Sequence, residues 1–134
     1  MNAQLTAWNP RILSLLRIVS AYLLLLHGTA KLLGVPHAPM FANLQIASLS
    51  GVAAIIELVF GALLLVGLFT RVSAFIASGL CAAAYFIGHV ATNGELLFPL
   101  LNRGESAVLF CFIFLYIVFA GPGPWSVDAM RQPD

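Results

Sequence analysis

The sequence predicts an all-α fold, a membrane-spanning antiparallel four-helix bundle that occupies residues 1–134 as a single domain. Three observations support this prediction. Of the 134 residues, 61% are hydrophobic and 8% are charged, and the mean hydropathy of +1.00 exceeds what a water-soluble core of this size can accommodate. Connections of about 11, 2 and 11 residues favour an up-down-up-down order of helices. Apolar runs long enough to cross a bilayer cover about 12–33, 45–69, 72–92 and 104–120.

Charge and cysteine content exclude several classes of function. The net charge of +1 provides no basic surface for nucleic acid. Cys81 and Cys111 lie inside apolar runs and form no CxxC pair, so we expect small buried side chains rather than a thiol relay or a thiolate metal site. The first apolar run continues to Leu33 without a cleavage-site pattern, which predicts a retained helix rather than a signal peptide.

The first predicted helix carries three basic side chains. Asn9-Pro10 precedes it and is expected to stop it from extending toward the N-terminus. At about 100° per residue, Arg17, His27 and Lys31 fall on one stripe. Two alternatives stay open. The arginine and lysine could extend toward opposite membrane interfaces, and the histidine could be a neutral imidazole bonded to a neighbouring helix.

The predicted helix over 45–69 contains one carboxylate, Glu57, near its middle. A charge at the centre of a bilayer costs at least about 2.5–3.5 kcal/mol on insertion scales. Small residues on the same face would let another helix approach closely. We therefore expect Glu57 to meet a donor or a cation of the first helix, and the candidate partners are His27, Lys31 and Arg17.

The third predicted helix, over 72–92, follows a turn at Thr70-Arg71. Its polar stripe includes Tyr85, His89 and Asn93. The alternative to a functional stripe is a packing face with amphipathic rings near the membrane interface. The following connection, up to residue 103, either lies in that interface or folds back over the bundle.

The fourth predicted helix, over 104–120, begins with Glu105 in its first turn. Negative charge at this position complements the helix dipole, so a capping role is the alternative to a functional one. The run Gly121-Pro122-Gly123-Pro124 ends the helix, and a short polar tail follows.

The arginines predict the orientation of the bundle. Arg11, Arg71 and Arg131 fall on one side of it, together with the two termini. Because cytoplasmic segments of membrane proteins are enriched in arginine and lysine, we expect both termini to be cytoplasmic.

At a rise of about 1.5 Å per residue, most of the polar residues fall in the outer third of the membrane, with Glu57 at mid-depth. They predict a polar pocket that opens toward the outside. Histidines and carboxylates at this depth suit proton-coupled reduction of a quinone head group, a proton path or a metal site. No metal site is expected, because no His-x-x-x-His or Glu-x-x-His pair lies on one helix face. The catalytic candidates are Glu57, His27, Lys31 and Arg17, and the substrate-pocket candidates are His89, Tyr85, Asn93, Asn102, Arg103 and Glu105.

Five sequence features occur in a characteristic order. The segment LLRIVSAYLLLLHGTAKLLG is followed by ELVFGALLLVGLFTR, by His89, by NRGESAVL and by GPGPWSVD. Together they resemble the DoxX family of small four-helix bacterial membrane proteins, over nearly the whole chain. The resemblance implies a bacterial inner-membrane protein. The family is named for its similarity to a subunit of an archaeal thiosulfate:quinone oxidoreductase, and the resemblance therefore implies a link to membrane-associated oxidoreductase complexes. It also implies importance at the family's recurring polar positions, which here are Arg17, His27, Gly28, Lys31, Glu57, Arg71, His89, Asn102, Glu105 and the Gly121-Pro122-Gly123 turn.

The leading hypothesis is a membrane subunit of a quinone-linked or redox-stress oxidoreductase system, in contact with the lipid bilayer and with partner proteins. In it, Glu57 and His27 handle protons, while Lys31 or Arg17 stabilises an anionic intermediate. A quinone is the expected substrate. No cofactor-binding motif is recognised, so any electron donor is expected to be another protein or a soluble substrate.

The main alternative is a membrane anchor or assembly factor without chemistry, in which the polar residues only hold the helices together. A small-molecule or proton transporter is less favoured, since the sequence has no internal repeat and no pair of broken helices. The sequence leaves open whether the chain is an enzyme and whether it forms a homo-oligomer.

Overall fold

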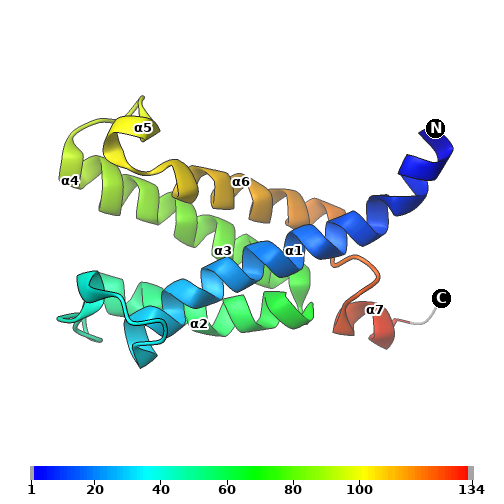
Figure 1. The fold of residues 1–134 in the computed structure, drawn as a ribbon, viewed down its shortest axis with the longest axis horizontal. Coiled ribbons are helices and arrows are strands. Elements are labelled where there is room, and N and C mark those ends of the chain that lie inside the picture. The colour runs from blue at the N-terminus through cyan, green and yellow to red at the C-terminus, as the bar shows by residue number, and fades with distance from the viewer. Residues whose placement is uncertain (1, 133–134) are drawn as a thin grey trace.

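The computed structural model describes residues 2–132, and its helices pack side by side as an antiparallel bundle (Figure 1). No strand occurs among these residues. Three helical segments are long and apolar enough to cross a membrane, and α6 is a shorter apolar helix of 16 residues. The all-α prediction is confirmed, and the arrangement is consistent with a membrane helical bundle. The three long segments are α1 (Asn2–Leu33), α2 (Leu49–Val66) and the continuous run of α3 (Thr70–Ala83), η2 (Ala84–Val90) and α4 (Ala91–Asn93), and the shorter helix α6 spans Glu105–Ala120.

Three short elements lie in the connections and the tail. They are η1 (Pro39–Phe41), α5 (Pro99–Asn102) and α7 (Val127–Arg131). Figure 1 places the start of α1, the α2–α3 turn and α7 at one end of the bundle, which we call the terminal end. The loops over 34–48 and 94–104 lie at the opposite end, which we call the loop end (Figure 1).

Helix α1 begins earlier than the sequence predicts. We expected Asn9-Pro10 to stop the helix, but α1 starts at Asn2 and continues through Pro10. A proline inside a helix removes one backbone hydrogen bond and pushes the preceding turn away, so it bends the helix without always ending it. The first turns of α1 accordingly bend away from the rest of the helix (Figure 1).

The turn between α2 and α3 lies three residues before the predicted one. We expected it at Thr70-Arg71, whereas Thr70 is already the first residue of α3. Gly67 ends α2 in the left-handed conformation, with φ of 71°, and the Leu68 N–H donates to the Leu63 carbonyl at 2.9 Å. This hydrogen bond is typical of glycine-terminated helices, which explains why the helix stops at Gly67.

The bundle consists of two closely packed pairs of helices. Helix α1 packs mainly against α2, and α3 packs mainly against α6. Glycines let α1 and α2 approach closely, because a Cβ atom at Gly28 would lie 2.6 Å from the Leu58 backbone nitrogen, and one at Gly61 would lie 3.0 Å from the Leu25 Cα. The two pairs cross over a shared apolar core and diverge toward the loop end (Figure 1).

Candidate functional site

A cavity of about 600 Å³ lies between the two helix pairs. Its walls come from α1, η1, α2, α3, η2 and α6, so every long segment of the bundle contributes to it. Its volume falls in the range of small-molecule sites, and apolar side chains such as Leu24, Leu80 and Phe110 form much of the wall. The polar side chains that reach it are His27, Lys31, Ser50, Glu57, Cys81, His89 and Ser106.

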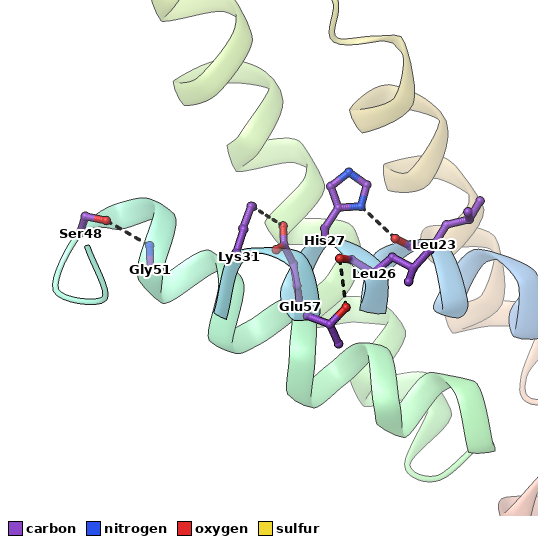
Figure 2. Close-up of polar contacts among 8 residues, drawn as sticks. Leu23, Leu26, His27, Lys31, Ser48, Gly51 and Glu57 are labelled. Carbon is purple, nitrogen blue, oxygen red and sulfur yellow. Dashed lines mark hydrogen bonds and ion pairs between the residues drawn. The ribbon is translucent and has the colours of Figure 1, made fainter. Parts of the chain in front are cut away.

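An ion pair joins α1 to α2 at this cavity. Lys31 Nζ lies 3.0 Å from Glu57 Oε1, and the two side chains are only 13% and 10% exposed. Figure 2 shows the two side chains reaching toward each other across the helix contact. Lys31 Nζ also lies 5.4 Å from the centre of the Phe41 ring, a cation–π contact. Of the three partners that the sequence suggested for Glu57, the structure therefore pairs it with Lys31.

The second carboxylate oxygen of Glu57 has no partner. Oε2 is buried and accepts no hydrogen bond, and among the described residues the only other such side-chain atom is Thr70 Oγ1, at the terminal end. Leaving a buried polar atom unsatisfied costs about 1–3 kcal/mol, and more for a charged group. Such an atom in the wall of a cavity points to a ligand that would complete its hydrogen bonding.

Two histidines line the cavity, and each has one ring nitrogen without a hydrogen-bond partner in the described part of the chain. His27 Nδ1 lies 2.9 Å from the Leu23 carbonyl (Figure 2), and His89 Nδ1 lies 3.1 Å from the Asn102 carbonyl. A carbonyl only accepts hydrogen bonds, so Nδ1 carries the proton in both rings. Neither Nε2 is hydrogen-bonded within the described residues. Each Nε2 is therefore available to a ligand or a proton.

Several cavity features were not predicted. The third helix was expected to be regular, but η2 is a π-helical segment, and it lines the cavity with Ala84, Ile87, Gly88 and His89. Such wider turns occur often at functional sites. Phe110 of α6 was also missed. It stands edge-on to His27, with ring centres 6.5 Å apart. No sequence signal marks either feature, because α6 is almost uniformly apolar and an extra residue in a helical turn has no fixed motif.

Arg17 lies away from the cavity, although the sequence made it a catalytic candidate and a candidate partner of Glu57. Its guanidinium is fully buried and donates to the carbonyls of Leu64 at 2.6 Å, Leu65 at 2.8 Å and Pro122 at 2.8 Å. It also donates to the Trp125 carbonyl. A cation at a helix C-terminus satisfies carbonyls that have no partner inside the helix. Arg17 thus ties the end of α2 to the segment after α6.

Tyr85 and Asn102 lie behind the cavity wall rather than in it. The Tyr85 hydroxyl donates to the Leu96 carbonyl at 2.7 Å. Asn102 is fully buried, and its side chain donates to Tyr85 Oη at 3.1 Å and to the Glu95 carbonyl at 2.7 Å. These bonds fold the loop over 94–104 back onto η2, one of the two placements that the sequence left open. They also hold the Asn102 carbonyl that orients His89.

The remaining pocket candidates also lie outside the cavity. The Asn93 side chain donates to the His89 carbonyl at 2.9 Å. Arg103 is exposed, with a left-handed φ of 59°. Glu105 is exposed in the first turn of α6, where its charge complements the helix dipole. The cavity therefore brings together Glu57, Lys31, His27 and His89, and not Arg17, Tyr85, Asn93, Asn102, Arg103 or Glu105.

The terminal end holds a second set of charge contacts. Asp128 of α7 accepts hydrogen bonds from the backbone N–H groups of Phe69 at 3.0 Å and Thr70 at 2.8 Å, and so caps the start of α3. Partial burial would raise the pKa of Asp128, but these hydrogen bonds and nearby Arg131 outweigh it and lower that pKa below its ordinary value. Arg71 donates to the carbonyls at the end of α6.

Comparison with known proteins agrees with the sequence and the geometry. A family model described as DoxX matches residues 12–90, which include the cavity residues of α1, α2 and η2. A protein of Haemophilus influenzae, named only as an uncharacterized protein, is 46% identical over 125 residues, which cover 92% of this chain and 93% of that protein. No solved structure matches. Among the described residues, no group of three or more histidine, cysteine or acidic side chains is placed to hold a metal ion.

Proposed function

The chain belongs to the DoxX family of membrane proteins, and we propose that its cavity binds the head group of a membrane quinone as part of a redox system. The observation that carries this proposal is the Lys31–Glu57 ion pair, which leaves Glu57 Oε2 buried and unpartnered in a largely apolar cavity. Burying an ion pair in this setting costs desolvation free energy, and a ligand that hydrogen-bonds to the free carboxylate oxygen would offset part of that cost.

The shape and polarity of the cavity fit a quinone. A quinone head group is a flat, mostly apolar ring with oxygen atoms at opposite edges. The apolar walls, including Phe110, suit the ring faces. Polar groups lie on opposite sides of the cavity, with the ion pair and His27 on α1 and α2, and with His89 on η2. Two oxygens at opposite edges of one ring could therefore both find partners.

A ligand can reach the cavity from the side of the bundle. Val52 of α2 is 51% exposed and Ile87 of η2 is 56% exposed, although both line the cavity. The opening between these helices thus lies on the surface that a bilayer would surround. A quinone dissolved in the membrane would enter without crossing the aqueous phase, which favours a membrane substrate over a soluble one.

The cavity residues have distinct roles in this proposal. Reduction of a quinone to a hydroquinone consumes two electrons and two protons. Glu57 and the free Nε2 of His27 each take up one proton from water and pass it to a ring oxygen, and Lys31 stabilises negative charge on the ring. The electrons come from a partner protein of the redox system or from a soluble reductant.

Two matched glycine substitutions test the location of the site. Gly88 lines the cavity and Gly79 does not, and a Cβ atom at either position would meet no atom within 4 Å. Gly88→Leu should occupy the cavity, whereas Gly79→Leu adds the same side chain to the same helical segment elsewhere. Binding of a radiolabelled short-chain ubiquinone to protein in lipid nanodiscs should weaken at least about tenfold for Gly88→Leu, because the head group and the new side chain cannot share the space. It should stay unchanged for Gly79→Leu. Absence of binding of both the ubiquinone and the corresponding ubiquinol by the unmodified protein, or equal binding by both variants, contradicts the proposal.

The second candidate function is a non-catalytic anchor or assembly factor. The hydrogen bonds of Arg17, which hold the end of α2 to the segment after α6, favour a purely structural use of at least one polar group. His27→Ala and Glu57→Gln distinguish the two functions, because they remove proton-transfer groups and keep most of the packing. A redox role predicts loss of redox-stress protection at normal protein level and normal partner recovery. An anchor predicts that function falls only as far as partner recovery does.

A further inference from the structure

Three side chains that line the cavity keep an atom without a hydrogen-bond partner among the described residues, and each of these atoms can act as an acceptor. Glu57 Oε2 is an acceptor when the carboxylate is ionised, as its 3.0 Å contact with Lys31 indicates. The Nε2 atoms of His27 and His89 are acceptors in the neutral rings, since each Nδ1 holds its proton against a backbone carbonyl. Three fixed positions around one cavity therefore offer lone pairs rather than protons.

Among the described residues, the one charged donor of the cavity is Lys31, and the remaining donors are weak or can also accept. Lys31 directs one of its three ammonium protons to Glu57 Oε1, and the other two can donate to a ligand oxygen. A ring hydroxyl can accept one of them while it donates to Glu57 Oε2, whereas a quinone carbonyl can only accept. The hydroxyl groups of Ser50 and Ser106 rotate and can either donate or accept, so they favour neither kind of ligand. The Cys81 thiol is a weak donor.

This balance discriminates between the two redox forms of a quinone. A quinone presents two carbonyl oxygens, which only accept hydrogen bonds, and one of them placed against Glu57 Oε2 would be repelled. A hydroquinone presents two hydroxyl groups, and one of them can donate to the unpartnered carboxylate oxygen. A hydrogen bond to a charged acceptor is roughly twice as strong as one between neutral groups.

We propose that the cavity selects ligands that donate hydrogen bonds from a ring hydroxyl, so that it holds a hydroquinone more tightly than the corresponding quinone. This inference rests on the proposed quinone site and specifies its preferred ligand. The second hydroxyl of the ring is directed to the Nε2 of His27 or of His89. The selection concerns binding alone, and it requires no electron transfer on this chain.

Three ligands with the same ring test the inference. They are a short-chain ubiquinol, the matching ubiquinone, and the dimethyl ether of the ubiquinol, which has no proton to donate. Binding is measured anaerobically in nanodiscs at pH 8. The ubiquinol should bind at least about tenfold more tightly than either of the other two, because only it donates to the carboxylate. Equal binding of ubiquinol and its dimethyl ether overturns the inference.

The variant Glu57→Gln gives an independent test. Its amide oxygen can keep the hydrogen bond from Lys31, and its NH2 group then presents donors where Oε2 presents lone pairs. The preference should therefore shift toward the ubiquinone by about tenfold or more. Glu105→Gln removes an exposed carboxylate outside the cavity and should leave the preference unchanged.

The outcomes separate this inference from the proposed function. If the unmodified protein binds ubiquinone as tightly as ubiquinol, and Gly88→Leu weakens both, the quinone site stands and the selection of the reduced form is refuted. If neither form binds, the quinone site itself is refuted. If Glu57→Gln remains folded by size-exclusion chromatography and keeps the original preference, Glu57 is not the selecting group and the inference fails.

Discussion

Replacement of Arg17 should destabilise the bundle more than replacement of any exposed basic residue. Its guanidinium is fully buried and donates to four carbonyls, those of Leu64, Leu65, Pro122 and Trp125. The Leu64 carbonyl keeps a hydrogen bond from the Gly67 N–H at 3.2 Å, but Arg17→Leu removes the guanidinium donor from the other three, at about 1–3 kcal/mol for each one that water cannot reach. Removal of a buried charge offsets part of this loss. We therefore expect the free energy of unfolding to fall by about 3–5 kcal/mol, the range for breaking a buried charged contact.

Two further substitutions sharpen this prediction. Arg17→Lys keeps the charge but replaces a planar fork of donors with a single ammonium, so it should recover only part of the lost stability. Arg11→Leu is the matched control, because Arg11 is exposed and reaches one carbonyl, that of Ala7, at 3.5 Å. It should change the stability by no more than about 0.5 kcal/mol.

The assay is thermal unfolding in detergent, followed by tryptophan fluorescence in a Trp8→Phe background. The remaining tryptophan, Trp125, provides one of the carbonyls that Arg17 binds, so its emission reports whether the segment after α6 stays docked. For Arg17→Leu we expect an early change in Trp125 emission below the main transition. If Arg17→Leu and Arg11→Leu unfold at the same temperature with the same emission profile, the structural role assigned to Arg17 is refuted.

Three other predictions follow from the ion pair, the α7 cap and the topology. Lys31→Leu should cost about 3 kcal/mol or more because it leaves the Glu57 carboxylate buried and unpaired; the double variant Lys31→Leu/Glu57→Leu should regain most of that loss in the same unfolding assay, and no recovery would contradict the pairing. Because the pKa of Asp128 is lowered in the folded state, its contribution to stability is complete above its unfolded pKa of about 3.9 and disappears as the pH falls through the folded value. Asp128→Asn should remove this part of the acid sensitivity. An acid-unfolding profile identical to that of the unmodified protein would refute the cap. In a cysteine-free background, Ala38→Cys should react with an impermeant thiol reagent on intact cells and Ala129→Cys should not, since we expect cytoplasmic termini; the reverse labelling rejects that orientation.

The sequence was sufficient to predict the fold class, because its composition and apolar runs follow from the bilayer itself. The family resemblance proposed from the motifs is confirmed by the family model and by the 46% identical relative. Element boundaries were less accurate. Pro10 was predicted to stop the first helix, and the α2–α3 turn was predicted at Thr70-Arg71. Both predictions were wrong because a single proline or glycine can either end a helix or lie within it, and the surrounding packing decides which occurs.

The candidate site was predicted in part. Helical periodicity placed His27 and Lys31 on one face, and the cost of a buried carboxylate directed Glu57 toward that face, so their proximity could be inferred. Arg17 lies on the same stripe of α1, but helical periodicity gives only the face of a residue and does not show which residue along that face contacts Glu57. The structure places Arg17 beside the end of α2, where unpaired carbonyls are available to it. The π-helical geometry of η2 has no counterpart in the sequence pattern.

The polar positions that the sequence resemblance singled out separate into two groups by whether their hydrogen-bonding capacity is used. The donors of Arg17 and Asn102 are engaged by backbone carbonyls and a tyrosine hydroxyl, so these side chains are explained by the fold alone. Glu57, His27 and His89 each keep an atom that the described residues leave without a partner, and all three line one cavity. A bundle that needed polar groups only for registry would gain stability by satisfying them. The buried, unpartnered oxygen of Glu57 therefore favours a ligand over a purely structural role in this cavity.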